Sequence, residues 1–339
     1  MDAAAEETHS LGVVCPEPGT VELREVPLGA LKPSEVRVAA TVTAISPGTE
    51  RAWFLAEEGA PVRFPYRPGY CHVGRVAAIG SAVRGLAIGD RVLSLSPHAA
   101  VVHVDAGRLI PVPAGVSDED AAMAPLAAIS LQGVRKAEIE LGSATAVLGA
   151  GLIGLLAMKL ARMAGAYPLV AADLSAHRRR IALRNGATHA VDTAALAALA
   201  QSVERSTAPD PGFDVVIDAT GHPGAVPTAI EVCGSSARLV LLGSTRGRAD
   251  GIDVYQVHYK GIRIIGAHNR NRPERSSQPG RWTWRDDVTL ILRLVRDGLL
   301  SFEGLVSDRV RPTDVPAVFE RLRARDETLL GCMIHWRSA

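Results

Sequence analysis

The sequence lacks several features that would mark a specialised class of protein. It has only 4 cysteines in 339 residues, and none of them belongs to a Cys-x-x-Cys pair. Isolated cysteines predict neither a disulfide framework nor a cysteine-built metal centre, and they are typical of a reducing compartment. No apolar run approaches the roughly 18 residues that a membrane-spanning helix needs. We therefore expect a cytoplasmic protein that has no membrane partner.

An excess of one charge is also missing. The chain has 37 Lys and Arg against 36 Asp and Glu, which gives a formal net charge of +1. A surface of mixed charges argues against a nucleic-acid partner or an anionic membrane surface. The first ten letters, MDAAAEETHS, are polar and acidic, so we expect no secretory signal peptide. The length is sufficient for two domains.

One glycine-rich stretch has the context of a dinucleotide-binding turn. Thr145–Leu148 predicts a strand buried on both faces, the letters GAGLIG follow it directly, and Leu152–Ala164 has helical spacing. A strand, a GxGxxG turn and a helix in this order form the pyrophosphate site of Rossmann folds. Gly149 permits the tight turn, Gly151 admits a phosphate to backbone N–H groups, and Gly154 lets the helix pack closely. The helix N-terminus supplies further amide donors.

An acidic residue follows at the distance expected of a ribose-binding group. The next predicted strand, Leu169–Ala172, is followed by Asp173, about twenty residues after the glycines. A carboxylate at this point accepts hydrogen bonds from both hydroxyls of an adenosine ribose and repels a 2′-phosphate. We therefore expect NAD as the cofactor, in preference to NADP.

The pattern of elements changes once along the chain. Residues 11–125 read as short strands separated by Gly, Pro and Asp, which suits a small folded-over barrel. From Asp118 helices alternate with strands, and this predicts an α/β fold with a doubly wound parallel sheet. After residue 265 come a polar stretch, a helix at 285–297 and a β/α tail that we expect to return to the barrel. The predicted strands are 144–148, 169–172, 189–191, 215–218, 238–242 and 263–265, and the helices between them include 152–164, 177–184 and 225–232.

These segments together resemble the medium-chain dehydrogenase/reductase superfamily, which includes the zinc-type alcohol dehydrogenases. The letters RPGY, GRVAAIGSAVRGLAIGDRV, GAGLIG, FDVVIDATG and ARLVLLGS occur in the superfamily's order. The resemblance implies a GroES-like β-barrel catalytic domain over residues 1–126 and a Rossmann NAD-binding domain over 127–265. It also implies that residues 266–339 return to the catalytic domain, that the substrate is a small molecule and that the protein forms a homodimer.

Further cofactor contacts are implied by the resemblance. In the family, the residue that matches Arg178 covers the adenosine. The residues that follow the fourth and fifth strands of the sheet lie along the ribose and the nicotinamide. The predicted cofactor-binding set is Gly149, Gly151, Leu152, Ile153, Gly154, Asp173, Leu174, Arg178, Thr220, Gly221, Leu242, Gly243 and Ser244.

The chain departs from the zinc-dependent branch at the metal ligands. Where zinc alcohol dehydrogenases carry Cys-Gly-Thr-Asp, residues 47–50 read PGTE, and where they carry Gly-His-Glu, residues 69–71 read GYC. Zinc needs three or four suitable ligands brought together, so we expect no metal. The letters ISPGTERAWF, YRPGYCHVGRV and SPHAAVVHV are instead similar to zinc-less members. These members include bacteriochlorophyllide hydroxyethyl dehydrogenases and bidomain sugar-pathway oxidoreductases.

Hydride transfer without a metal requires a side chain that exchanges a proton with the substrate oxygen. Thr49 matches the family's proton-relay hydroxyl, and Glu50 becomes a suitable base if burial raises its pKa. Tyr70 occupies the position of a zinc-ligating His, and His98 is of the residue type that titrates near neutral pH. Of these four catalytic candidates we favour Glu50 as the base. Each also has an ordinary structural interpretation: a strand end, an ion pair, a core aromatic and a turn residue, respectively.

A loop after the last predicted strand offers His268, Asn269 and Arg270 as substrate contacts, although a solvated loop is the simpler interpretation. We expect a zinc-independent, NAD-dependent oxidoreductase acting on a secondary alcohol or ketone of a small biosynthetic metabolite such as a sugar or cyclitol. Two other classes stay open. One is an NAD(P)H-dependent enone or quinone reductase, against which Asp173 counts. The other is a non-catalytic nucleotide sensor, against which the intact glycine motif counts.

Overall fold

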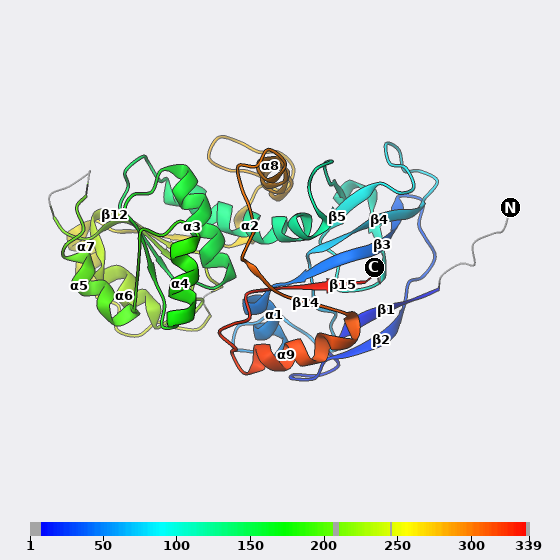
Figure 1. Ribbon diagram of the computed structural model, residues 1–339, viewed down its shortest axis with the longest axis horizontal. Coiled ribbons are helices and arrows are strands. Elements are labelled where there is room, and N and C mark those ends of the chain that lie inside the picture. The colour runs from blue at the N-terminus through cyan, green and yellow to red at the C-terminus, as the bar shows by residue number, and fades with distance from the viewer. Residues whose placement is uncertain (1–7, 206–209, 245, 337–339) are drawn as a thin grey trace. The chain divides into compact units, whose positions relative to one another are not determined.

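The computed structural model describes residues 8–205, 210–244 and 246–336, and the chain divides into two compact units (Figure 1). Unit 1 comprises Met1–Pro125 and Val288–Ala339, and unit 2 comprises Leu126–Asp287. Residues 1–7, which contain most of the acidic stretch that argued against a signal peptide, lie outside the described residues. Among the described helices, none is both long and apolar enough to cross a membrane.

Unit 1 is built mainly from antiparallel strands. Its larger sheet has the order β14-β15-β3-β4-β5-β7, with β6 also paired to β3, and β1 pairs with β2 in a separate ribbon. Along β3 buried and partly buried residues alternate, which is the period of a strand with one face in the core. Phe54 of α1 packs edge-to-face on Phe319 of α9, with 5.2 Å between ring centroids. The strands are β1 His9–Val14, β2 Glu22–Pro27, β3 Glu35–Ile45, β4 His72–Ile79, β5 Arg91–Ser94, β6 Val101–Asp105, β7 Ile110–Pro111, β14 Val306–Val310 and β15 Gly331–His335, and the helices are α1 Pro47–Phe54 and α9 Val315–Arg323.

Unit 2 contains a parallel sheet with the strand order β10-β9-β8-β11-β12-β13. Every residue of β8, β9 and β11 is buried, as expected of strands covered by helices on both faces. The strand order runs outward in both directions from β8 and β11, which confirms the predicted doubly wound sheet. The carboxyl ends of these two strands form the switch point where such sheets bind ligands. The strands are β8 Thr145–Leu148, β9 Leu169–Ala172, β10 His189–Val191, β11 Phe213–Asp218, β12 Cys233–Leu241 and β13 Arg263–Gly266, and the helices are α3 Leu152–Ala164, α4 Ala176–Arg184, α5 Leu196–Ala200, α6 Ala225–Glu231 and α7 Val254–Lys260.

Two helices, α2 Asp118–Ala137 and α8 Trp284–Arg296, contain the points where the units divide. The first division lies one residue from the boundary that we expected after residue 126. The second differs, because unit 2 continues to Asp287 and the return begins at Val288 instead of residue 266. Arg272 pairs with the fully buried carboxylate of Asp287, which also accepts a hydrogen bond from Arg135 Nε at 3.0 Å. These ion pairs attach the polar stretch to unit 2.

Helix α1 is an element that we did not expect. Thr49 and Glu50 lie inside it, so Thr49 does not end a strand. Pro47 opens the helix at a position where its missing N–H removes no helical hydrogen bond. The helix directs Glu50 into unit 1, where only 3% of this residue is exposed.

Candidate active site

The glycine turn after β8 has the geometry that its sequence predicts. Gly149 has φ +88°, a left-handed conformation that favours glycine. A Cβ on Gly154 would lie 1.8 Å from the carbonyl oxygen of Gly149, so only glycine lets α3 start this close to the turn. A Cβ on Gly151 would meet only the Arg178 guanidinium, at 4.0 Å. The space beside Gly151 is therefore open at the N-terminus of α3, where backbone N–H groups bind a pyrophosphate.

Asp173 is held beside this turn by the backbone. Its Oδ2 accepts a hydrogen bond from the N–H of Ala150 at 2.7 Å, and its Oδ1 accepts one from the N–H of Ser175 at 2.8 Å. Each carboxylate oxygen keeps a further lone pair for a ribose hydroxyl. Leu174 is 79% exposed next to it. Ser175 caps α4 by accepting a hydrogen bond from the N–H of Arg178, which fixes where the Arg178 side chain begins.

Two loops at the carboxyl ends of β11 and β12 are tied together by Asp218. Its side chain accepts hydrogen bonds from the N–H and the hydroxyl of Thr220, at 2.9 and 2.6 Å. Its carbonyl oxygen accepts the N–H groups of Leu242 and Gly243. A Cβ on Gly243 would lie 2.4 Å from the nitrogen of Gly221, so the loops meet through their glycines. The predicted ribose and nicotinamide residues therefore lie together at the carboxyl edge of the sheet.

Two of the predicted catalytic side chains are hydrogen-bonded to each other inside unit 1. His98 Nε2 lies 2.9 Å from Glu50 Oε2, and both residues are almost fully buried. The other carboxylate oxygen, Oε1, accepts the N–H of Ser46 at 2.7 Å. His98 Nδ1 lies 2.8 Å from the hydroxyl oxygen of Thr43, which also accepts a hydrogen bond from Trp336 Nε1 at 3.0 Å. A continuous hydrogen-bonded chain thus runs from Trp336 to Ser46.

The hydroxyl of Thr43 sets the direction of this chain. An indole N–H can only donate, so the oxygen of Thr43 accepts from Trp336 and its hydrogen needs an acceptor. Thr43 is fully buried, and among the described residues His98 Nδ1 is the acceptor that its hydroxyl meets. With Thr43 donating to Nδ1, Nε2 is the ring nitrogen of His98 that donates a hydrogen bond to Glu50 Oε2. This arrangement pairs a buried carboxylate with a buried imidazole.

Of the four catalytic candidates, Tyr70 and Thr49 are partly exposed. We call the four residues Thr49, Glu50, Tyr70 and His98 the catalytic cluster. Burial is the main cause that raises the pKa of the Tyr70 phenol, and the nearby Cys71 and Glu50 add to it. Hydrogen bonds with Ser46 and Thr49 act in the opposite direction but are outweighed. The phenol stays protonated through the physiological range and can donate to an oxygen. Unlike Glu50, these two residues have some exposed surface.

The residues at the zinc-ligand positions do not fit a zinc ion. Within the described parts of the chain, no three His, Cys, Asp or Glu side chains gather in a metal-binding group. Both ring nitrogens of His98 are already engaged, by Thr43 and by Glu50. Cys71 is fully buried, and burial, together with Glu50, raises the pKa of its thiol well above its ordinary value. Pro47 has no side-chain donor at all.

The predicted substrate residues stabilise their own loop. His268 Nδ1 accepts the N–H of Arg270 at 3.1 Å, and the carbonyl of His268 accepts a hydrogen bond from Gln132. The amide oxygen of Asn269 accepts Arg272 Nε at 3.0 Å. Arg270 is exposed. These contacts support the simpler interpretation of a structured surface loop for His268 and Asn269.

Comparisons with known proteins show what the chain is similar to. The family model described as "Zinc-binding dehydrogenase" matches residues 153–282. D-guloside 3-dehydrogenase of Escherichia coli K12 is 26% identical over 248 residues, which are 72% of this chain and 70% of that protein. L-threonine 3-dehydrogenase of Chromobacterium violaceum is 27% identical over 310 residues, 80% of this chain and 85% of the relative. The chain is therefore similar in sequence to zinc-binding dehydrogenases and to dehydrogenases named for a D-guloside and for L-threonine.

Solved structures of dehydrogenases share the fold of this chain. A zinc-binding dehydrogenase of Sinorhizobium meliloti bound to NADP superimposes with a TM-score of 0.79 at 23% identity, over 96% of this chain and 99% of that one. An alcohol dehydrogenase of Escherichia coli CFT073 complexed with NADH superimposes with a TM-score of 0.81 at 16% identity. The match covers 97% of this chain and 99% of that one. The named relatives are dehydrogenases, and the two solved structures were determined with NADP and with NADH.

Sequence reasoning missed Thr43, Ser46 and Trp336, which hold the Glu50–His98 pair, and Asp218, which ties the two cofactor loops. Asp218 lies in the DATG letters next to Thr220, and its position at the end of a buried strand could have identified it. Thr43 is one of several buried positions on β3, and Trp336 lies beyond β15, so neither has a local signal.

Proposed function

We propose that the protein is a zinc-independent, NAD-dependent dehydrogenase that interconverts a secondary alcohol and a ketone in a small, hydroxyl-rich metabolite. The observation that carries this proposal is the buried, hydrogen-bonded Glu50–His98 pair, whose Glu50 belongs to the letters PGTE that match Cys-Gly-Thr-Asp of the zinc-dependent branch. The names of the relatives, a D-guloside 3-dehydrogenase and an L-threonine 3-dehydrogenase, support a hydroxylated substrate.

The cofactor preference rests on Asp173. Its carboxylate is fixed next to the glycine turn by two backbone N–H groups, so a 2′-phosphate would meet a negative charge that cannot move away easily. The two structural neighbours bind NADP and NADH, so their cofactors do not favour either one. When bound, the nicotinamide accepts a hydride from the alcohol carbon or returns it to the ketone.

The side chains of unit 1 handle the proton. The hydroxyls of Tyr70 and Thr49 bind the substrate oxygen, because Tyr70 and Thr49 are the partly exposed residues among the four catalytic candidates. As the alcohol loses its hydride, its hydroxyl proton passes through these groups to the Glu50–His98 pair, and the C=O bond forms. In the reverse direction the pair returns the proton. Thr43 and Trp336 keep His98 in the tautomer that this transfer needs.

A turnover screen on secondary alcohols, ketones and enones with NAD(H) and NADP(H) tests the proposal. Glu50→Gln and His98→Asn should each lower kcat by about 10²–10⁴-fold, with the Kd for NADH unchanged within about twofold. Glu58→Gln, an exposed carboxylate on the segment after α1, is the matched control and should behave as wild type. Elemental analysis should find no stoichiometric zinc, and chelators should leave turnover intact.

Each part of the proposal has its own contrary result. Wild-type turnover in both Glu50→Gln and His98→Asn would show that the pair is structural. About one zinc per chain, with activity lost when it is removed, would show a metal enzyme. Reduction of enones with NADPH, without activity on alcohols, would identify a double-bond reductase. Nucleotide binding without turnover on any substrate would favour a sensor.

A further inference from the structure

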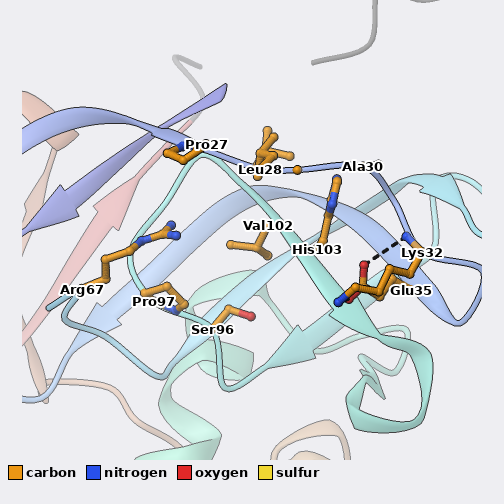
Figure 2. Close-up of a pocket in the computed structure, with 12 residues that line it drawn as sticks. Pro27, Leu28, Ala30, Lys32, Glu35, Arg67, Ser96, Pro97, Val102 and His103 are labelled. Carbon is orange, nitrogen blue, oxygen red and sulfur yellow. Dashed lines mark hydrogen bonds and ion pairs between the residues drawn. The ribbon is translucent and has the colours of Figure 1, made fainter. Parts of the chain in front are cut away.

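A pocket of about 410 Å³ opens in unit 1 and has no part in the chemistry described above (Figure 2). It lies between the segment that follows β2, strand β6 and the loop that follows β5. Its polar lining comes mainly from Lys32, Glu35, Arg67, Ser96 and His103. This volume falls within the range of sites that hold small metabolites.

Arg67 is the unusual member of this lining. Its Nε and one terminal nitrogen, Nη2, are buried and have no hydrogen-bond partner among the residues that the structure describes. Figure 2 shows its side chain on the pocket wall with no interaction drawn to the other residues. Burial lowers the pKa of the guanidinium, and no acid among the described residues forms an ion pair with it. A largely buried cation without a counter-charge costs free energy that a bound anion would recover.

The other charges of the pocket leave this cation uncompensated. Glu35 is the acid in the lining. Its carboxylate accepts one hydrogen bond from the backbone N–H of Lys32 and one from Lys32 Nζ, each at 3.1 Å. These hydrogen bonds, above all the one from the backbone, lower the pKa of Glu35 and hold it ionised. His103 Nε2 accepts a hydrogen bond from Arg37 Nε at 3.2 Å. With Lys32 and Glu35 balancing each other, the pocket has a net positive charge centred on Arg67.

We propose that this pocket binds a small oxyanion, a phosphate or carboxylate group of a metabolite, through the guanidinium of Arg67. A guanidinium offers parallel N–H donors that match two oxygens of such a group. The hydroxyl of Ser96, which is hydrogen-bonded to Ser94 Oγ at 2.9 Å, adds a neutral donor or acceptor to the same wall.

The pocket shares two chain segments with the catalytic cluster. Pro97 lines the pocket, and His98, the next residue, pairs with Glu50. Arg67 precedes Pro68, whose carbonyl accepts the N–H of His98 at 2.8 Å. An anion that orders Arg67 and Pro97 therefore acts on the backbone that positions His98. This step rests on the proposed function, and it makes the oxyanion an effector of turnover.

Binding is tested on the full-length protein by calorimetric titration with inorganic phosphate and, separately, with citrate, at an ionic strength held constant with chloride. We expect saturable binding of at least one of the two anions in the wild type, and at least about tenfold weaker binding in Arg67→Gln. The anion that binds distinguishes a phosphate source from a carboxylate source. Arg63→Gln, an exposed arginine on the preceding segment, is the matched control and should bind as the wild type does.

A second variant guards against misfolding of Arg67→Gln. Ala30 is exposed at the pocket, so Ala30→Glu adds a repelling charge without altering a buried residue and should also abolish binding. Absence of saturable binding in the wild type, or equal binding in Ala30→Glu and the wild type, would overturn the site. The saturating anion should also change the wild-type kcat by at least about twofold and leave the kcat of Ala30→Glu unchanged. Binding without any effect on kcat would overturn the effector role alone. If Glu50→Gln and His98→Asn instead kept the wild-type kcat, the proposed function would be refuted and the binding result would still stand.

Discussion

Asp173 is a fixed negative charge at the end of β9, because both of its oxygens already accept backbone N–H groups. Asp173→Ala removes the acceptors for the ribose hydroxyls and should weaken NADH binding by about 1.5–3 kcal/mol. Binding of NADPH should be unchanged or improved, because the repulsion of the 2′-phosphate is lost. Fluorescence titration with both nucleotides measures the two effects.

The matched control for this variant is Asp253→Ala. Asp253 caps α7 by accepting the N–H of Gln256, so its loss should leave both nucleotide affinities unchanged. A wild-type protein that binds NADPH more tightly than NADH would contradict the assigned preference, whatever the variant does.

His72 makes the stability of the protein depend on pH. It is fully buried on β4, its Nε2 lies 3.2 Å from the carbonyl of Ala99, and burial lowers its pKa to about 4, with smaller effects of the same sign from His98 and Arg67. The unfolded chain has a His pKa of about 6.5. Below this pH the unfolded state takes up a proton that the folded state does not bind. The contribution of His72 is therefore fully present above pH 6.5 and is lost as the pH falls toward 4.

At pH 5 this loss amounts to about 2 kcal/mol of the free energy of unfolding. Urea unfolding at pH 7.5 and pH 5 should show that the wild type loses about this much more stability than His72→Gln does. His189→Gln, at an exposed position of β10, should keep the wild-type dependence on pH. Parallel losses in the wild type and His72→Gln would show that His72 is protonated in the folded state.

At the scale of elements, the contact between β8 and α3 separates stability from nucleotide binding. A methyl group on Gly154 would lie 1.8 Å from the Gly149 carbonyl oxygen, so Gly154→Ala must displace α3 and should cost about 1–3 kcal/mol of stability. Gly151 has φ −73°, which any residue adopts, and open space beside it. Gly151→Ala should therefore fold normally but bind NADH weakly, because its methyl group occupies the space of the pyrophosphate. Thermal unfolding and NADH titration of both variants measure the difference, and a destabilised Gly151→Ala would contradict it.

The elements that could be predicted from the sequence are those that depend on contiguous residues. The glycine turn depends on the conformation of contiguous residues, so its strand, helix and Asp173 were evident, and α3 has the predicted bounds Leu152–Ala164. The support of His98 depends instead on residues that are distant in the sequence. Thr43 is 55 residues from His98 and 293 from Trp336. Thr43 and Trp336 meet because β3 pairs with β15 in a register that places Thr43 opposite Ile334. This register cannot be predicted from the local sequence of either strand.

The domain boundary and the role of Glu50 show the same limit. The sequence predicts that the polar stretch after β13 begins the return of the chain to the barrel domain. In the structure this stretch belongs to unit 2, where Arg272 and Arg135 form ion pairs with Asp287. Glu50 was favoured as a base in contact with the substrate. The structure buries Glu50 and engages both of its carboxylate oxygens, one with His98 and the other with the N–H of Ser46. Both differences come from buried polar contacts that the spacing of the residues along the chain does not reveal.

At the scale of the whole molecule, the outer edge of β13 favours assembly with a second copy of the chain. Within the described residues β13 pairs on one side only, with β12, and Ile264 on it is 43% exposed. An apolar edge strand left open is a site for pairing with another chain. On the preceding helix, α7, the rings of Tyr255 and Tyr259 stack with 5.8 Å between their centroids, and most of the surface of both residues is exposed. We therefore propose that β13 pairs with the β13 of a second copy in a two-fold symmetric homodimer.

Light scattering coupled to gel filtration tests this assembly. The wild type should have a mass of twice 35.7 kDa, and Ile264→Lys, which adds a charge to the open edge, should shift the protein to the single-chain mass. Leu141→Lys is the matched control, because Leu141 is 91% exposed in the loop before β8 and should have no influence on the mass. NADH binding should persist in the monomeric variant, since the glycine turn and Asp173 lie at the β8 and β9 strands, which are not neighbours of β13 in the sheet. A wild-type monomer would refute the dimer, and an Ile264→Lys dimer would move the interface away from this edge.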